Sequence, residues 1–391
     1  MFTLHLIVVM FVPVCTLQFH QRPEEHFFSA VGEAYRACVE LGDIWVRIGN
    51  STGRTDVASH GKELLALADN LYHDLHQSLS LSVNTTASPG DRCYPHRVED
   101  GLWSLHHLDA GQMGNIYRSF SELFFSGALT EQQTDDMYES GQGLNNCPMR
   151  FWMCMGTPSE FQNVFSHIPF GFPYSLLQHD MVERFLLYYF TQSAHVATRG
   201  FFMTPESSSI VDRTHEVAFS SAGPNNVVAA LKWMLVFEEP ETRTLWLAKA
   251  TPRDWLRPGE APIAVQHATT RYGRVCFALS AATAGAGGYV VRANVTLPAS
   301  FGTAGSKPSG GVRLRIRAPV EHAGRMSGVT VGGKAWAGFD AATETVAFTS
   351  AELTPELVAT GLRDVVVSFS AKSARAQLRR APVDMGDRVL Y

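Results

Sequence analysis

The chain has 391 residues, of which 45% are hydrophobic, 18% charged and 11% aromatic, and its formal net charge is -5. This length and apolar content predict a globular protein of about two domains. The acidic balance gives no broad basic field, so the composition argues against a nucleic-acid partner.

The N-terminal segment 1–26 begins with an apolar run, "MFTLHLIVVMFVPVC", that has the length of a signal peptide. No Lys or Arg precedes the run, and the residues around Cys15 form a poor cleavage site. Two interpretations therefore stay open: a secreted or lumenal protein, or a cytoplasmic one whose first helix is truncated here. No other stretch has the composition of a membrane span.

Glycosylation triplets suit a secreted protein but also arise by chance in a chain of this length, and the cysteines form no dense disulfide framework. N-x-[ST] triplets, the acceptor pattern for N-glycosylation, begin at Asn50, Asn84 and Asn294. The six cysteines show no CxxC pair; Cys147 and Cys154 are spaced for one disulfide, although buried free thiols are the simpler interpretation.

Residues 27–250 are predicted to form a helical domain. Apolar residues recur at helical spacing in the segments 27–48, 60–79, 113–126, 131–140, 175–197 and 225–249. In "SGALTEQQ", Gly127 is expected to end one helix, while Thr130 and Gln133 form the N-cap and capping box of the next. These signals predict a helical hairpin.

A change of pattern separates this domain from the rest. The stretch "PRDWLRPGEAPI" contains three prolines and a glycine, which predicts a linker over 251–262. Strand patterns with turn signals between them follow, so residues 263–391 are expected to form an antiparallel β-sandwich.

The clearest of these strands is "VRLRIRAPV", in which Val312, Leu314 and Ile316 alternate with arginines. The three arginines, Arg313, Arg315 and Arg317, have two explanations. A solvated strand face is favoured, and a site for an anionic ligand is the alternative.

The helix predicted over 179–195 carries polar residues on one stripe and apolar residues on the rest of its circumference. The stripe consists of Asp180, Glu183, Arg184, Thr191 and His195. Such a stripe faces either solvent, which is the default, or an internal cleft.

Glu206 follows this helix in the polar stretch "TRGFFMTPESSSIVD". A carboxyl group that Pro205 and short polar neighbours hold in place is suited to general acid catalysis on a sugar, provided that a second carboxylate lies opposite. Taken alone, Glu206 is more simply an exposed loop acid or a capping residue. The candidates for the second carboxylate are Asp180, Glu183, Asp212, Glu216, Asp109 and Glu122.

Other chemistries lack a recognisable motif. His106, His107 and Asp109 do not have metal-ligand spacing, so no metal and no cofactor is expected. Phosphate-binding glycine loops and the G-x-S-x-G nucleophile motif are absent from the sequence. The aromatic residues Trp103, Tyr117, Tyr174, Tyr188 and Trp233 could stack on sugars, although most are expected in the core.

Several phrases resemble the C-terminal half of large proteins in the six-hairpin glycosidase superfamily. They are "GFPYSLLQHDMVERFLLYYFTQSAHVATRGFFMTPES", "LKWMLVFEEPETRTLWLAKATPRDWL" and "ATTRYGRVCFAL". The resemblance implies an α+β multidomain protein, with a partial or complete (α/α)6 toroid followed by a β-sandwich. Six hairpins need twelve helices and about six are predicted, so either the N-terminal part of the toroid is missing, which is the expectation, or the helical pattern underestimates the number of helices. The apolar flanks of an incomplete toroid would be exposed.

The resemblance also implies a function, namely a glycoside hydrolase with an inverting pair of acids. Glu206 then becomes the best candidate for the general acid, with Asp180, Glu183 or Asp212 as the second carboxylate. Arg199, His195, Tyr188 and Trp103 become candidate substrate-binding residues. The alternatives are a non-catalytic carbohydrate-binding or scaffold protein, and a polysaccharide lyase using Tyr188, His195 and Arg199. Glycan identity, stereochemical outcome and oligomeric state stay open.

Overall fold

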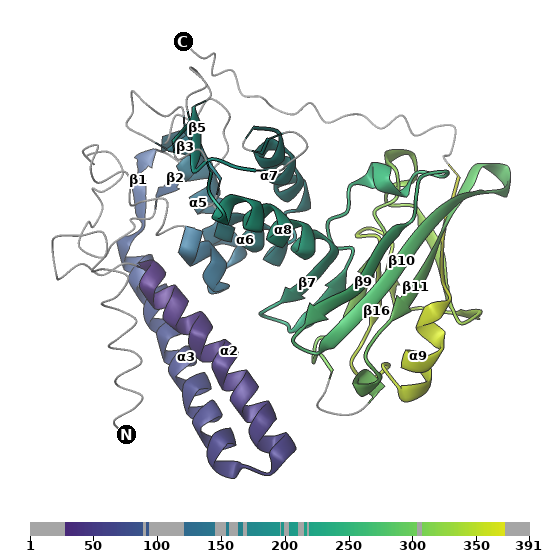
Figure 1. Ribbon diagram of the computed structural model, residues 1–391, viewed down its shortest axis with the longest axis horizontal. Helices are drawn as coiled ribbons and strands as arrows, with labels where there is room; N and C mark the ends of the chain where they lie inside the picture. Colours follow the sequence, from purple (N-terminus) through teal and green to yellow (C-terminus); the bar gives the residue numbers. More distant parts are fainter. Residues whose placement is uncertain are drawn as a thin grey trace. The chain divides into compact units, whose positions relative to one another are not determined.

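The computed structural model describes residues 28–88, 91–93, 121–144, 154–155, 163–166, 170–195, 197–198, 203–209, 215–216, 219–302 and 307–371. The chain divides into two compact units, Met1–Thr242 and Arg243–Tyr391. Most helices lie in the first unit and the larger sheets in the second, so the protein is of the α+β class (Figure 1). The structure therefore confirms the predicted order of helices followed by strands.

Helices α2 (Phe28–Thr52) and α3 (Thr55–Ser82) form a long hairpin in the first unit (Figure 1). Glycines allow the two backbones to approach closely, because a Cβ on Gly42 would lie 2.9 Å from the Gly61 carbonyl oxygen. Cys38, Leu64 and Ala68 form the buried core between the helices. Neither these two helices nor the others that the structure describes are long and apolar enough to cross a membrane.

The capping box predicted at Thr130 and Gln133 is confirmed. Residues 121–126 are helical and end at Gly127, whose φ is 75°. The backbone N–H of Gln133 donates to Thr130 Oγ1 at 3.2 Å, and the backbone N–H of Thr130 donates to the side-chain Oε1 of Gln133 at 3.0 Å. These reciprocal bonds fix the start of helix α5 (Glu131–Leu144).

The single helix predicted over 175–197 is wrong. The chain forms α6 (Gly171–Gln178) and α7 (Val182–His195), separated by a turn in which Asp180 has a φ of 60°. The N–H of Asp180 donates to the Leu177 carbonyl and that of Met181 to the Leu176 carbonyl. These bonds are the Schellman arrangement that ends a helix, with aspartate in the left-handed position that glycine usually takes.

The helix predicted over 225–249 is also too long. Helix α8 (Ala222–Leu235) gives way directly to β7 (Val236–Glu239), which is followed by β8 (Thr244–Leu247). Aromatic and β-branched residues favour the strands, and Pro240 cannot continue a helix. The division between the two units falls in the turn between these strands, ahead of the linker expected at 251–262.

The first unit also contains small sheets that the sequence pattern did not predict. Strands β1 (Asn84–Ser88) and β2 (Asp91–Cys93) pair with each other. A four-stranded antiparallel sheet has the order β3 (Cys154–Met155), β4 (Asn163–Phe165), β5 (Ser207–Ser209) and β6 (His215–Glu216). Strand β5 lies inside the stretch expected to be a loop.

Two sheets contain all the described strands of the second unit, and one of them also includes β7, the last strand of the first unit. The six-stranded sheet has the order β14 (Lys334–Ala335), β13 (Met326–Val331), β17 (Val365–Phe369), β11 (Gly288–Thr296), β10 (Gly273–Ala284) and β9 (Ile263–Thr270). The five-stranded sheet has the order β15 (Phe339–Asp340), β16 (Thr345–Phe348), β12 (Val312–Arg315), β8 and β7. Strand β12 runs parallel to β8, whereas the other registered pairs are antiparallel.

The alternation predicted for these strands is present. In β10, Val275, Phe277 and Leu279 are buried, and β11 alternates buried and exposed residues in the same way. The only α-helix of the second unit among its described residues is the short α9 (Pro355–Ala359), capped by Thr354. The stretch expected to be a linker contains a 3-10 turn, Arg253–Leu256, and the Leu256 carbonyl accepts a hydrogen bond from Tyr289 Oη.

Candidate functional site

Glu206 stands immediately before β5, where the backbone holds it on both sides. Its carbonyl accepts a hydrogen bond of 3.0 Å from the Ser166 N–H, at the end of β4. The carbonyl of Thr204 accepts one of 2.7 Å from the Ser220 N–H. Thr204 and Pro205 are buried, whereas Glu206 is partly exposed. The structure thus presents one partly exposed acid on a fixed piece of backbone.

Buried polar groups gather beside Glu206. The Ser166 carbonyl accepts a hydrogen bond from Gln192 Nε2 of α7 at 2.6 Å and one from Asn226 Nδ2 of α8 at 3.3 Å. Ser166 is 0% exposed and Gln192 3% exposed. Among the described residues, Ser166 Oγ and Gln192 Oε1 have no hydrogen-bond partner. We call Ser166, Gln192, Thr204, Glu206 and Asn226 the Ser166 cluster.

Gly223, in the first turn of α8, closes one side of the Ser166 cluster. A Cβ on this residue would lie 1.9 Å from Thr204 Oγ1 and 2.6 Å from Ser166 Oγ. The two hydroxyl groups therefore converge on the glycine, and a side chain there would displace both of them.

Asp180 and Glu183 lie at the opposite end of α7 from the Ser166 cluster. Gln192 follows Glu183 by nine positions along α7, and at ~1.5 Å per residue this is ~13 Å along the helix axis. An inverting pair of acids is separated by about 6.5–9.5 Å. The position of Glu206 beside the C-terminal half of α7 thus disfavours both residues as its opposing carboxylate.

The polar stripe predicted for this helix does not form a single face. Asp180 lies in the turn before α7, and Arg184 forms an ion pair with Asp135 of α5. The guanidinium of Arg184 also lies 4.3 Å from the ring centre of Tyr138. The exposed side of α7 instead combines Glu183 with two apolar residues, Leu187 and Phe190.

Tyr188 belongs to the core. Its ring packs edge-on against Phe172, with 5.5 Å between the ring centres, and only 3% of the residue is exposed. Burial raises the pKa of its hydroxyl group. A lyase base must reach its substrate and lose a proton, so this environment disfavours that role for Tyr188. Tyr174 is likewise buried, in edge-on contact with Trp233.

The other residues predicted for the site are not all placed. Trp103, Arg199 and Asp212 lie outside the described residues, as do Tyr117, Asp109 and both histidines at 106–107. The structure places the backbones of His195, at the end of α7, and of Glu216, opposite Ser207 in the β5–β6 pair. Glu216 is therefore the candidate acid whose backbone lies nearest in register to Glu206.

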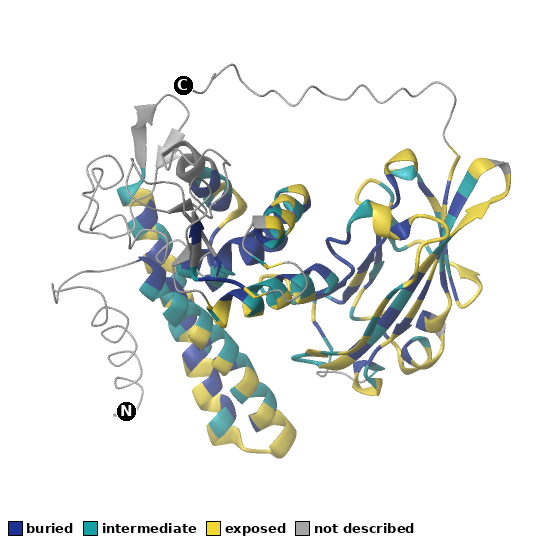
Figure 2. Ribbon diagram, turned by 45° about the horizontal axis from the view of Figure 1, so that its top comes forward, coloured by how far each residue is buried: buried dark blue, intermediate teal, exposed yellow. Residues whose placement is uncertain are grey.

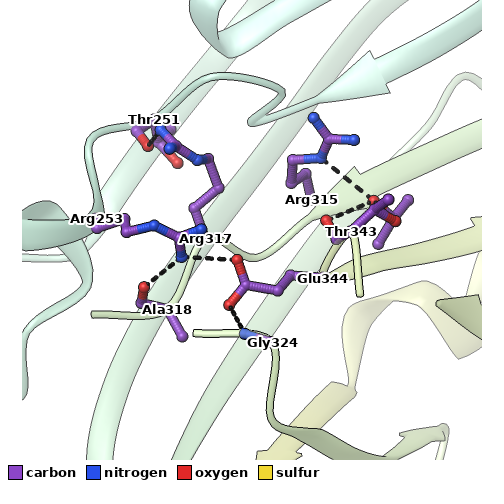
Figure 3. Close-up of polar contacts among 9 residues, drawn as sticks. Thr251, Arg253, Arg315, Arg317, Ala318, Gly324, Thr343 and Glu344 are labelled. Carbon is purple, nitrogen blue, oxygen red and sulfur yellow. Dashed lines mark hydrogen bonds and ion pairs between the residues drawn. The ribbon is translucent and has the colours of Figure 1, made fainter. Parts of the chain in front are cut away.

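A second polar centre, in the other unit, corrects the interpretation of the alternating arginines. Arg313 is exposed as expected, but Arg315 and Arg317 are each only 4% exposed. Arg317 donates to the Thr251 carbonyl at 3.0 Å, and Arg315 donates to Thr345 Oγ1 at 3.3 Å (Figure 3). Thr345 is the cross-strand neighbour of Arg315 on β16, and Thr251 belongs to the segment after β8, so both arginines are buried against protein groups rather than placed on a solvated face.

Glu344 carries the negative charge of this centre. It is 2% exposed, and its carboxylate accepts hydrogen bonds from Arg253 Nη1 at 2.7 Å and the Gly324 N–H at 3.1 Å (Figure 3). The same Arg253 nitrogen donates to the Ala318 carbonyl at 2.7 Å. These contacts join three loops, which indicates a structural role.

Trp246 completes the centre on the neighbouring strand β8. Lys249 Nζ lies 4.2 Å from its ring centre, and the guanidinium carbons of Arg313 and Arg315 lie 5.0 Å and 4.8 Å from it. The indole thus stabilises positive charge on the five-stranded sheet. Since protein groups hold these buried cations, the centre offers no support for an anionic ligand.

Metal ligation finds no support in the described part of the chain, which contains no group of three or more His, Cys, Asp or Glu side chains suited to a metal ion. Cys38 and Cys276 are free thiols, and the disulfide considered for Cys147 lies outside the described residues.

No protein-family model, curated protein or solved structure matches the chain.

The Ser166 cluster contains residues that the sequence analysis did not select. Gln192 was the detectable signal among them, because it is a polar residue on the apolar side of a strongly apolar helix. Ser166 and Asn226 carry no such signal, since each lies in a segment of mixed composition. The pairing of β4 with β5 brings Ser166 beside Glu206, and the packing of α8 brings Asn226 to the Ser166 carbonyl.

Proposed function

We propose that the protein is a glycoside hydrolase that cleaves a glycan by general acid/base catalysis, with Glu206 as the acid. The observation that carries the proposal is the position of this glutamate. It is a partly exposed carboxyl group fixed by its own backbone beside buried hydroxyl and amide groups. Neutral polar groups of this kind hydrogen-bond sugar hydroxyls, and a positioned carboxyl group protonates a leaving oxygen.

The second carboxylate in this proposal is Glu216. Its backbone is paired with Ser207, the residue after Glu206, whereas Asp180 and Glu183 belong to the far end of α7. Glu206 lies one residue before the Ser207–Glu216 pair, and successive side chains of a strand alternate between its two faces, so the proposal requires that the bend at Glu206 turns its carboxyl group toward the face of Glu216.

The decisive experiment is Glu206→Gln, assayed by the release of reducing sugar from a panel of polysaccharides. We expect turnover of any glycan that the protein cleaves to fall by about 10²–10⁴-fold, because the amide keeps the shape of the carboxyl group but its N–H protons are not acidic enough to protonate a leaving oxygen. Glu63→Gln, at an exposed site on α3, is the matched control and should leave turnover unchanged. Equal turnover in the Glu206 variant and the control would rule out the assignment.

The same assay separates the remaining alternatives. A non-catalytic carbohydrate-binding protein would retain a glycan without releasing sugar. A lyase would release an unsaturated product that absorbs ultraviolet light. A large loss in Asp180→Asn or Glu183→Gln, with Glu216→Gln active, would move the second carboxylate to the other end of α7.

A further inference from the structure

Helix α2 carries two adjacent apolar seams, and α3 covers only one of them. The first seam consists of Cys38, Gly42, Trp45 and Gly49, at alternating steps of four, three and four residues, and it packs on α3. The second seam is offset from it by one residue and consists of Ala37, Leu41, Ile44 and Ile48. Steps of four and three residues are the heptad spacing of a helix that packs against another helix.

The second seam, which we call the outer seam, faces solvent. Leu41 and Ile44 are each 42% exposed and Ile48 is 47% exposed, while Ala37 also belongs to the exposed class. Figure 2 shows exposed residues recurring along both helices of the hairpin. On α3, however, the exposed residues are mainly polar, as at Lys62, Glu63, Asp69, Asn70, His73 and Asp74. Two helices of one hairpin thus have outer faces of opposite character.

From this contrast we infer that the outer seam of α2 binds the same seam of a second copy of the chain, as an antiparallel helix pair. In this arrangement Leu41 packs against Ile44 of the other copy, and Ile48 against Ala37, each contact occurring twice by symmetry. This pairing covers all four apolar residues of the seam in each copy. The same surface of α2 therefore forms both sides of the interface.

Charge favours this partner and this direction. Glu40 and Arg47 occupy the flanking position just before Leu41 and Ile48, respectively. When the two helices run antiparallel with the layers given above, Glu40 of each copy lies beside Arg47 of the other. A parallel pair would instead set Glu40 beside Trp45, without an opposite charge. Arg47 also forms an ion pair of 3.9 Å with Asp43 on its own helix. Its side chain is 38% exposed, so its charge lies at the edge of the outer seam.

The interface is small, since each helix contributes two heptads. A seam of this size predicts a reversible dimer with a Kd on the order of micromolar rather than a permanent one. Sedimentation velocity of the full chain across this concentration range should therefore show a monomer–dimer equilibrium.

The test is a set of exposed substitutions on the two helices. Ile44→Glu should raise the dimer Kd by at least about 10-fold, because it places a charge in both central layers. Ala66→Glu puts the same charge at an exposed position of α3 and should leave the Kd unchanged. Circular dichroism checks that both variants keep the helical content of the wild type.

A charge exchange tests the antiparallel direction independently. Glu40→Arg and Arg47→Glu should each weaken the dimer several-fold, and the double variant should recover the wild-type Kd, because opposite charges then meet again. A double variant weaker than both single variants would overturn the antiparallel pair.

Three further outcomes would overturn the dimer itself. The wild type could be monomeric at all concentrations, or its dimer could be indifferent to Ile44→Glu. A chain that dimerises only after residues 1–27 are removed would show that this segment occupies the outer seam instead.

Discussion

Glu344 illustrates how one buried carboxylate organises several loops. It pairs with Arg253 at 2.7 Å, and 3% of its side chain is exposed against 25% for the arginine. Water has little access to the position of the Glu344 carboxylate. Removing its negative charge therefore leaves the partly buried Arg253 guanidinium without a counter-charge, next to the Ala318 carbonyl. The ion pair is therefore a local requirement of the fold.

We predict that Glu344→Gln lowers the free energy of unfolding by about 3 kcal/mol. Urea unfolding followed by fluorescence would measure the change, with Glu352→Gln as the control. Glu352 is exposed and caps only its own turn through Thr349, so its substitution should cost less than about 1 kcal/mol. Similar losses in the two variants would contradict the structural role of Glu344.

The burial of Arg315 and Arg317 could not be predicted from the pattern of residues within their own strand. Alternation along "VRLRIRAPV" correctly predicts that Arg313 and Arg315 share one side of the strand, where both lie over Trp246, whereas Arg317 lies beyond the end of β12. It carries no information on whether other segments cover that side. The groups that hold the two arginines are far away in sequence, with Thr345 on the neighbouring strand β16 and Thr251 after β8, and a pattern within one strand cannot reveal them.

At the scale of elements, local chemistry predicted some boundaries and missed others. The Thr130 capping box was predictable because its hydrogen bonds lie within four residues. The break at Asp180 was not, because aspartate occupies a position that glycine usually marks. Strand β7 was missed since "KWMLVF" has apolar residues suited to either structure, and pairing with β8 decides between them.

His76 joins two elements, α3 and the start of α5. Its Nε2 lies 2.9 Å from the Ala128 carbonyl oxygen, and its Nδ1 lies 3.1 Å from Gln133 Nε2. The carbonyl can only accept and the amide nitrogen can only donate, so this geometry requires a neutral ring with its proton on Nε2. Gln133 is also the residue that closes the capping box.

This arrangement predicts a dependence of stability on pH. Burial, the largest effect, lowers the pKa of His76, the hydrogen bond to Ala128 opposes it, and His73 adds to the lowering. A folded-state pKa below the unfolded value means that stability is fully present above about pH 6.5 and falls as the pH drops toward the folded-state pKa. Urea unfolding between about pH 7.5 and 5 should show this loss, and His76→Gln should reduce it. An unchanged profile in the variant would exclude His76 as the cause.

At the scale of the whole molecule, the sequence predicted a helical part followed by strands but not the division between them. The predicted linker contains more prolines than any nearby stretch, yet its Leu256 packs within the second unit. The turn between β7 and β8, where the division falls, contains a single proline. For the site, the sequence selected Glu206, while the groups around it come together only through sheet pairing.

The order of the strands gives the last prediction. Both large sheets are formed from strands between Val236 and Phe369, and β7 is the edge strand next to β8. A fragment of residues 236–371 therefore retains every strand of these sheets, whereas a fragment of residues 243–371 leaves the backbone of β8 unpaired along one side. We expect the longer fragment to unfold cooperatively in urea and the shorter one to have a lower midpoint, both followed by circular dichroism. Equal midpoints would show that β7 does not stabilise the sheet, and an unfolded longer fragment would show that the second unit depends on the helical one.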